Sequence, residues 1–307
     1  MFEKLSFPNR ITVELTNRCN VSCTFCPRQS VDMELGDMDW ELYQKIIDEA
    51  AEHLPVKLVI FFRGESLLYD KFDEAIRYAK EKGLGPIQLS SNALALDEKA
   101  ADMIIKNKVD FISFSLDTLD PIIYKKSRLY GDLEKSVANV IRFSEKCSAL
   151  RNAGEFAPTI QVSTIELPEY LEGEDAYIEF WKKYADIVRV YYEHDDNGHF
   201  VDEEVNKQLI PNSQRQPCRK VFTDFLIYWD GRVALCNYDW RGMAFHQNVK
   251  YSTIQEIWDS KEFENIRKMH RENLFADDIM CKDCEHWKID YVEGGFLGKM
   301  FRKEETV

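Results

Sequence analysis

Residues 11–26, Ile-Thr-Val-Glu-Leu-Thr-Asn-Arg-Cys-Asn-Val-Ser-Cys-Thr-Phe-Cys, join a strand-like run to three closely spaced cysteines. The run at 11–16 is apolar and β-branched, which is typical of a buried strand. Cys19, Cys23 and Cys26 follow it directly. Three thiolates can hold three corners of a cubane iron–sulfur cluster and leave the fourth iron open to another ligand. A zinc site that lacks its fourth ligand is the alternative.

The rest of the first two-thirds of the chain alternates further strand-like runs with amphipathic stretches. The expected strands are 57–62, 86–91, 111–116, 158–165 and 187–193. Two helical stripes lie between them, formed by Tyr43, Ile46, Ile47 and Ala50 behind an Asp39 cap, and by Leu133, Val137, Val140 and Ile141. Parallel strands with right-handed helical crossovers predict an α/β fold, a partial (β/α)6 barrel of the TIM type. Its functional groups should follow the C-terminal ends of the strands.

Composition and charge exclude several classes of protein. The 307 residues include 40 Lys and Arg against 54 Asp and Glu, a net charge of −14, and 45% are hydrophobic. The hydrophobic content excludes disorder, and the acidic balance argues against nucleic acid as the main partner, because phosphate binding depends on clustered Lys and Arg. No apolar run approaches the roughly 18 residues that span a bilayer, and the N-terminus lacks a signal-peptide pattern. We therefore expect a cytoplasmic protein that binds neither nucleic acid nor membranes.

A second set of cysteines lies in the last third of the chain: Cys218, Cys236, Cys281 and Cys284. Runs at 221–228 and 232–235 flank Asp230-Gly231, which predicts a β-hairpin between the first two cysteines. Apolar residues at helical spacing over 254–269 predict one helix before the last two. Four thiolates suit either a fully ligated [4Fe–4S] cluster or a tetrahedral zinc ion, and spacing alone does not choose between them.

The first cysteine cluster and the segments after strands two to four resemble motifs of the radical SAM superfamily. Phe25 matches the aromatic residue of its CxxxCxφC motif, and Gly64-Glu65 resembles its GGEP segment, with Arg63 and Ser66 departing from it. The stretches 90–92 and 114–117 resemble its TNG and SxDG segments, with Ala93 and Thr118 where the family has glycine. The resemblance implies that S-adenosylmethionine (SAM) is bound by Phe25, Gly64, Glu65, Ser91, Asn92, Ser115, Asp117 and Arg128.

The C-terminal third, with its hairpin, helix and CxxC, resembles the twitch domain, a shortened SPASM domain that carries one auxiliary cluster. The cysteine spacing is similar to that of radical SAM dehydrogenases of the type that acts on 2-deoxy-scyllo-inosamine in butirosin biosynthesis. The resemblance implies two [4Fe–4S] clusters and a one-electron donor such as flavodoxin or ferredoxin. We expect a barrel over residues 1–193, a linker over 194–217 and a small α+β auxiliary-cluster domain over 218–307. Zinc stays open as the alternative at the second site.

These features predict a reaction as well as a fold. In the radical SAM superfamily, reductive cleavage of SAM yields a 5′-deoxyadenosyl radical that removes hydrogen from an unactivated carbon. A fully ligated cluster nearby favours oxidation of a hydroxyl-bearing small molecule, sugar-like or cyclitol-like, with that cluster as the electron acceptor. Arg63 is expected to contact the substrate, and Glu193 or His194, at the end of the sixth strand, is expected to act as the base.

Three other functions stay open. The first is a redox-neutral radical epimerase, which needs a hydrogen donor. Cys147 is expected to be a buried structural thiol late in its helix, which argues against that role and leaves Tyr191 or Tyr192 as donors. The second is a peptide-modifying SPASM maturase, and the third is a non-catalytic iron–sulfur or zinc protein.

Overall fold

The computed structural model describes residues 2–195, 198–201, 205, 209–242, 244–292 and 298–303. Six parallel strands lie at its centre, and each falls where the sequence predicts one. They are β1 (Arg10–Val13), β3 (Lys57–Ile60), β4 (Ile87–Ser91), β5 (Phe111–Ser115), β7 (Thr159–Glu166) and β8 (Ile187–Tyr192). Neighbouring strands pair in this order, so the sheet is the predicted partial barrel.

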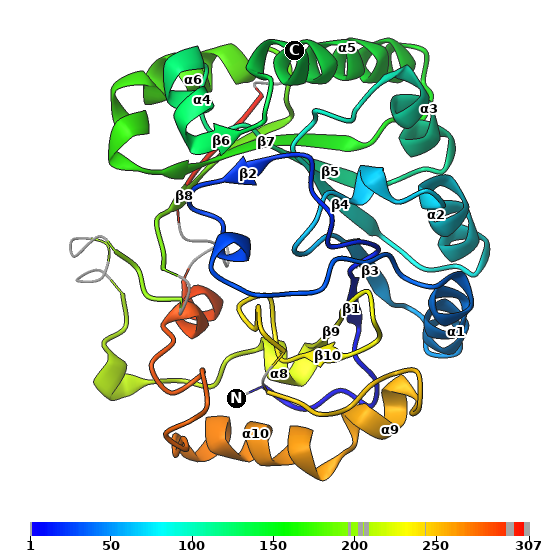
Figure 1. Cartoon of the computed structure of the whole chain (residues 1–307), viewed down its shortest axis with the longest axis vertical. Helices are drawn as coiled ribbons and strands as arrows, with labels where there is room; N and C mark the ends of the chain where they lie inside the picture. Colours follow the sequence, from blue (N-terminus) through cyan, green and yellow to red (C-terminus); the bar gives the residue numbers. More distant parts are fainter. Residues whose placement is uncertain are drawn as a thin grey trace.

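Helices cover the outer face of the curved sheet (Figure 1). They are α1 (Trp40–Ala51), α2 (Phe72–Glu81), α3 (Glu98–Lys106), α4 (Pro121–Ser127), α5 (Leu133–Asn152) and α6 (Glu174–Trp181). Asp39 caps α1 as predicted, because its side chain accepts hydrogen bonds from the backbone N–H groups of Glu41 and Leu42. Cys147 is buried in α5, which confirms the prediction of a buried thiol.

Short elements connect the strands to the loops above them. A two-stranded sheet that the sequence did not predict pairs β2 (Ser22–Cys23) with β6 (Arg128–Leu129). It joins the first cysteine loop to the end of α4. The 3-10 turns are η1 (Pro27–Gln29), η2 (Ser66–Leu68), η3 (Pro168–Gly173), η4 (Asn212–Gln214) and η5 (His286–Tyr291).

The C-terminal third extends the barrel sheet at both of its edges. After the short helix α8 (Lys220–Thr223), β9 (Asp224–Ile227) and β10 (Val233–Ala234) form the predicted hairpin. Strand β9 also pairs in parallel with β1, and β11 (Gly298–Arg302) pairs antiparallel with β8. In the described residues the sheet order is therefore β10-β9-β1-β3-β4-β5-β7-β8-β11. The limits proposed for barrel, linker and auxiliary domain stay a prediction, since the sheet continues across them.

The helix predicted over 254–269 is two helices in the structure. Helix α9 (Ile254–Trp258) ends at Asp259, and α10 (Lys261–Glu272) begins behind Ser260, whose hydroxyl accepts a hydrogen bond from the backbone of Phe263. The single-helix prediction was wrong because Ser260 is an N-cap. Within the described ranges, no helix has the length and apolar character needed to cross a membrane.

Candidate functional site

A cavity of about 700 Å³, here called the rim cavity, opens where the C-terminal ends of the barrel strands meet the first cysteine loop. It brings together residues that lie far apart in the sequence. Of the predicted site residues, it is lined by Cys19, Cys23, Phe25, Cys26, Arg63, Gly64, Glu65, Ser91, Asn92, Ser115, Arg128, Glu193 and His194. Of the residues predicted to bind SAM, only Asp117 does not line it; Asp117 lines the neighbouring cavity described below.

The three cysteines of the first loop present a thiol site with positive charge beside it. Burial raises the pKa of all three thiols, that of Cys23 to about 12, while the Arg128 guanidinium opposes the rise. Strand pairing of β2 with β6 places Cys23 opposite Arg128. Thiols of this kind lose their protons when iron binds, because the metal supplies the missing charge. The donor set therefore fits an iron–sulfur cluster with one open iron.

The loop after β3 packs directly on the first cysteine loop. A Cβ atom at Gly64 would lie 2.4 Å from the backbone oxygen of Thr16 and 2.6 Å from that of Arg18, so no side chain fits there. Glu65 donates its backbone N–H to Arg18 and is itself buried. Its carboxylate accepts hydrogen bonds from the backbone of Asn92 at 2.8 Å and of Leu67 at 3.2 Å, and burial raises its pKa. This packing fixes Gly64 and Glu65 against the cysteines.

Buried polar pairs complete the wall of the rim cavity. Arg128 donates to Asp117 at 2.6 Å, with the two side chains only 5% and 3% exposed, and its guanidinium carbon lies 5.7 Å from the Phe25 ring centroid. Asn92 donates to Asn20 at 2.7 Å and approaches the Cys19 sulfur at 3.8 Å. Asp117, Arg128 and Phe25, all predicted to contact SAM, are therefore held in place by one another.

Arg63 is the predicted site residue whose surroundings differ most from expectation. Its side chain is 1% exposed and forms two hydrogen bonds with the Glu14 carboxylate, at 2.7 and 2.8 Å. A third bond goes to the backbone oxygen of Trp240 at 3.1 Å, and the guanidinium lies 4.0 Å from the Tyr228 ring centroid. This geometry favours a structural role over the predicted contact with a substrate.

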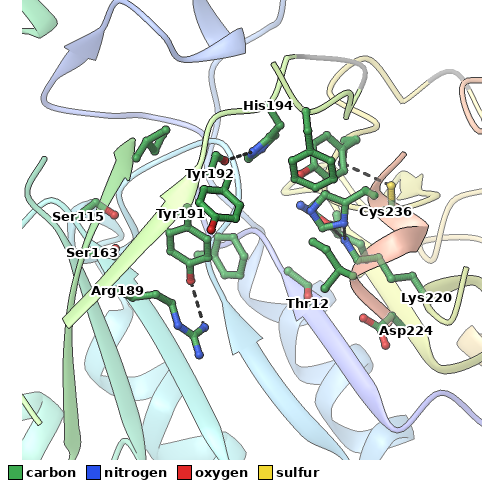
Figure 2. A pocket seen from close by; sticks show the side chains of 18 of the residues that line it. Thr12, Ser115, Ser163, Arg189, Tyr191, Tyr192, His194, Lys220, Asp224 and Cys236 are labelled. Carbon is green, nitrogen blue, oxygen red and sulfur yellow. Dashed lines mark hydrogen bonds between the residues drawn. The ribbon is translucent and has the colours of Figure 1, made fainter. Parts of the chain in front are cut away.

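A second cavity of about 480 Å³, the interior cavity, continues from the rim cavity into the barrel. In Figure 2, Arg189, Tyr191 and Tyr192 of β8 lie on one side of it, and Thr12 and Lys220 lie on the other. Its lining is rich in hydroxyl and charged groups, and includes Thr12, Ser115, Ser163, Thr164, Arg189, Tyr191, Tyr192, Lys220, Asp224 and Asp290. A small polar molecule would find many hydrogen-bond partners there.

The two predicted bases lie where β8 ends. Glu193 lines the rim cavity, and burial together with the nearby Glu169 carboxylate raises its pKa. His194 lines both cavities, and its Nδ1 lies 3.3 Å from the backbone oxygen of Tyr192. Because a carbonyl only accepts, Nδ1 donates this bond, and in the neutral ring the lone pair is on Nε2.

The second set of cysteines meets in one enclosed place, here called the four-cysteine cavity. Cys218, Cys236, Cys281 and Cys284 all line it. Burial raises the pKa of each thiol, that of Cys284 to about 11, and the Lys220 ammonium lowers the pKa of three of them. The backbone N–H groups of Tyr238 and His286 donate to the sulfurs of Cys236 and Cys284, each at 3.4 Å. These donors suit bound thiolates.

Aromatic side chains form part of the boundary between the four-cysteine cavity and the other two cavities. Tyr238 lines all three cavities, and His286 lines the interior and the four-cysteine cavities. Their ring centroids are 4.5 Å apart, and that of His194 lies 5.3 Å from the Tyr238 ring. Cys236, Lys220 and Leu235 also line both the interior and the four-cysteine cavities, so the second cysteine site borders the interior cavity directly.

Sequence reasoning missed Glu14, Lys220 and Tyr238. Glu14 follows strand β1, and Tyr238 lies two residues after the predicted ligand Cys236. Lys220 lies two residues after Cys218. A search for charged and aromatic residues close to the predicted ligands would have found Lys220 and Tyr238, whereas Glu14 becomes a partner of Arg63 only in the folded sheet.

Comparisons with known proteins agree with this geometry. Residues 13–152 match the radical SAM superfamily, and residues 218–285 match SPASM, an iron–sulfur cluster-binding domain. The chain therefore contains a radical SAM domain followed by a SPASM domain. The predicted family and fold class are confirmed. These domains imply SAM, iron–sulfur clusters, a reductant and a substrate.

Individual relatives share low sequence identity with this chain. The chain is 23% identical over 322 residues to the tungsten-containing aldehyde ferredoxin oxidoreductase cofactor-modifying protein of Pyrococcus furiosus, covering 89% of this chain and 86% of that protein. It is similar in structure to Streptococcus suis SuiB bound to the precursor peptide SuiA, with TM-score 0.72, 15% identity, and coverage of 96% and 75%. For BtrN in complex with AdoMet and 2-DOIA the TM-score is 0.62, with 20% identity and coverage of 92% and 94%. Both structural likenesses establish a shared fold.

Proposed function

We propose that this protein is a radical SAM dehydrogenase, which oxidises a hydroxyl group of a sugar-like or cyclitol-like small molecule to a ketone. The observation that carries the proposal is the position of the four-cysteine cavity. It brings four thiols together, and it borders the interior cavity directly, because both cavities are lined by Lys220, Leu235, Cys236, Tyr238 and His286. A site with four protein ligands has no open position for a substrate, so electron transfer is the chemistry that suits it.

The cofactors would divide the reaction between two sites. When bound, SAM and the cluster held by Cys19, Cys23 and Cys26 supply a 5′-deoxyadenosyl radical that removes one hydrogen atom from carbon, and an auxiliary [4Fe–4S] cluster accepts one electron. The remaining requirement of alcohol oxidation is that the hydroxyl proton passes to a base. One hydrogen atom, one electron and one proton then leave the alcohol, which balances its conversion to a ketone with a proton released.

Residues of this chain supply binding and the base. The hydroxyl-lined interior cavity supports a polar substrate of small size, with Ser115 and Tyr191 among its hydrogen-bonding groups. His194 is the base that the geometry favours, because it lines both cavities and carries a lone pair on Nε2 in the tautomer described above. Glu193 is the second candidate. The pair of Glu14 and Arg63 fixes the segment that leads into Gly64 and Glu65.

Iron rather than zinc is proposed for the second site. Residues 218–285 match an iron–sulfur cluster-binding domain, which supports a [4Fe–4S] cluster at this site in addition to the one held by Cys19, Cys23 and Cys26. Zinc cannot accept an electron, so it would not serve the proposed oxidation. We place the protein in the cytoplasm, with flavodoxin or ferredoxin as its electron donor.

The test is an anaerobic assay of the reconstituted protein with SAM, dithionite and a panel of cyclitols and sugars that includes 2-deoxy-scyllo-inosamine and myo-inositol. We expect 5′-deoxyadenosine and a ketone in equal amounts from at least one member of the panel. A Cys218→Ala/Cys236→Ala variant should still cleave SAM but form no ketone. Formation of 5′-deoxyadenosine from a panel member that is returned unoxidised would contradict the proposal.

Two alternatives have specific signatures in the same assay. Tyr191 and Tyr192 line the interior cavity, so an epimerase with a tyrosine donor would add solvent deuterium to the recovered substrate. Peptide modification is the activity suggested by the likeness to SuiB, whose structure contains a bound precursor peptide. It would appear as no turnover of the panel together with a mass change in a peptide substrate.

A further inference from the structure

The four-cysteine cavity contains N–H donors that have no acceptor. Arg215 Nε, His270 Nε2 and Trp287 Nε1 are buried atoms without a hydrogen-bond partner among the described residues. All three residues line the cavity that Cys218, Cys236, Cys281 and Cys284 also line. His270 is 3% exposed and Trp287 is fully buried. Burying a donor without an acceptor is unfavourable, so three such donors in one cavity indicate a missing acceptor.

Other contacts fix His270 and Arg215 in place and leave one N–H of each for the cavity. The backbone N–H of Cys218 donates to His270 Nδ1 at 3.3 Å, so the proton of the neutral ring is on Nε2. The terminal nitrogens of Arg215 donate to the backbone oxygens of Cys281 and Lys282, and its guanidinium lies 4.3 Å from the Phe275 ring centroid. An indole N–H only donates. The cavity therefore presents three N–H donors, which an occupant with several hydrogen-bond acceptors would satisfy.

A sulfur cluster is an occupant of that kind. Inorganic sulfides and cysteine thiolates both accept N–H hydrogen bonds, and two of the thiols already accept them from the backbone. Lys220 adds a positive charge, since its ammonium lies within 3.5 Å of His286 Nδ1 beside Cys284. Hydrogen bonds to sulfur and nearby cations stabilise the more negative, reduced state of a cluster and raise its reduction potential.

We infer that Arg215, His270 and Trp287 donate hydrogen bonds to the sulfur atoms of the auxiliary cluster and make it a better electron acceptor. The inference rests on the proposed function, because that function assigns this cluster the electron from the substrate-derived radical. The residues act by positioning and polarity, and none of them replaces a cysteine ligand. One electron enters the cluster as the substrate loses one electron and its hydroxyl proton.

The test measures the auxiliary cluster alone, in the full chain with the Cys19→Ala/Cys23→Ala/Cys26→Ala substitutions. A redox titration of the reconstituted protein, followed by electron paramagnetic resonance, gives the midpoint potential. His270→Phe and Trp287→Phe each remove one N–H donor and keep a ring, so each should shift the potential to more negative values with iron content unchanged. His270→Gln keeps a donor and should fall between. Trp258→Phe is the matched control, because the Trp258 indole is buried and already donates to the Leu5 backbone oxygen at 2.9 Å.

The outcomes separate this inference from the proposed function. Unchanged potentials in both ring variants, with full iron content, would overturn the inference, and so would zinc in place of iron. If a variant fails to bind a cluster, pulsed electron paramagnetic resonance on wild-type protein labelled with ¹⁵N-histidine or ¹⁵N-tryptophan tests the hydrogen bonds instead. A weak nitrogen coupling to the reduced cluster is expected, and its absence contradicts the inference. The potential is measured without substrate. Shifted potentials in a protein that oxidises no alcohol would therefore support the hydrogen bonds to the cluster and contradict only the proposed dehydrogenase activity.

Discussion

At the scale of single residues, the buried pair of Glu14 and Arg63 connects two parts of the chain. Glu14 follows β1 and Arg63 follows β3. Glu14 accepts a hydrogen bond at 3.2 Å from the backbone N–H of Trp229 in the turn of the C-terminal hairpin, and Arg63 donates at 3.1 Å to the backbone oxygen of Trp240, which follows that hairpin. Gly64 and Glu65 come directly after Arg63. The pair therefore links the loop predicted to bind SAM to the unit that holds the second cysteine site.

Replacement of Arg63 should destabilise the protein far more than replacement of a surface arginine. Arg63→Met leaves the Glu14 carboxylate buried without its partner, at an expected cost of about 3–5 kcal/mol in the free energy of unfolding. Arg77→Met breaks an exposed pair with Glu81, with both side chains at least half exposed, and should change it by about 0.5 kcal/mol or less. Urea unfolding of the reduced apoprotein measures both. Equal effects would show that the buried pair is not a structural link.

The pKa of Glu193 should depend on Glu169. Burial and the Glu169 carboxylate both raise the Glu193 pKa, so Glu169→Gln should lower it. A glutamate base works when deprotonated, and activity that depends on it rises with pH through its pKa. The substitution should therefore move the low-pH limb of product formation to lower pH. Carboxyl ¹³C NMR of glutamate-labelled apoprotein, assigned with Glu193→Gln, measures the Glu193 pKa directly. An unchanged Glu193 pKa in Glu169→Gln would refute the coupling. If the pKa falls but the low-pH limb of activity does not move, His194 is left as the base.

At the scale of elements, the loop after β3 is positioned by its contact with the first cysteine loop. The segment after β3 is built around Gly64, because a Cβ atom there would meet the backbone of residues 16–18. Gly64→Ala must displace the first cysteine loop. We expect SAM affinity to fall about tenfold or more, equivalent to about 1.4 kcal/mol, by calorimetry on the reconstituted protein.

Gly173→Ala is the control for Gly64→Ala. A Cβ atom at Gly173 would meet no heavy atom within 4 Å. Its φ of −101° is open to any residue, so affinity should not change. Similar losses in both variants would mean that the contact with the cysteine loop is not the cause.

The break between α9 and α10 also makes a prediction. Ser260 caps α10 through a hydrogen bond from the Phe263 backbone at 3.3 Å, so Ser260→Ala should lower the free energy of unfolding by about 1 kcal/mol. Ser252→Ala is the control, because the Ser252 hydroxyl makes no hydrogen bond within the described part of the chain. Thermal unfolding of both variants measures the difference. No difference would show that the break has another cause.

The sequence predicts secondary-structure elements better than it predicts contacts between residues far apart in the chain. All six barrel strands and the hairpin could be predicted, since β-branched runs and Asp230-Gly231 are local signals. Strand β11 could not, because it forms on the open edge of β8 and its mixed composition carries no such signal. The buried ion pair of Arg63 was also hidden: Glu14 lies 49 residues away and becomes a neighbour only when β1 pairs with β3. Ala93 adopts a φ of +63° where the family has glycine, so that departure is accommodated by the backbone.

At the scale of the whole molecule, one continuous sheet holds two cysteine sites around a shared interior. The C-terminal hairpin pairs with β1, and β11 pairs with β8, so the unit with four cysteines is joined to the barrel at both edges (Figure 1). The two cavities that meet the first cysteine loop also meet Tyr238, beside Cys236. The arrangement suits transfer of one electron from a substrate to the second site over a short path.

The central claim is that both cysteine sites hold [4Fe–4S] clusters, and metal analysis tests it most directly. Iron, sulfide and zinc are measured per chain after anaerobic purification and reconstitution, for wild type and for Cys218→Ala/Cys236→Ala. We expect about eight irons in the wild type and about four in the variant, with matching sulfide and no zinc. About four irons and one zinc in the wild type, with iron unchanged by the substitutions, would contradict the claim and make the second site structural.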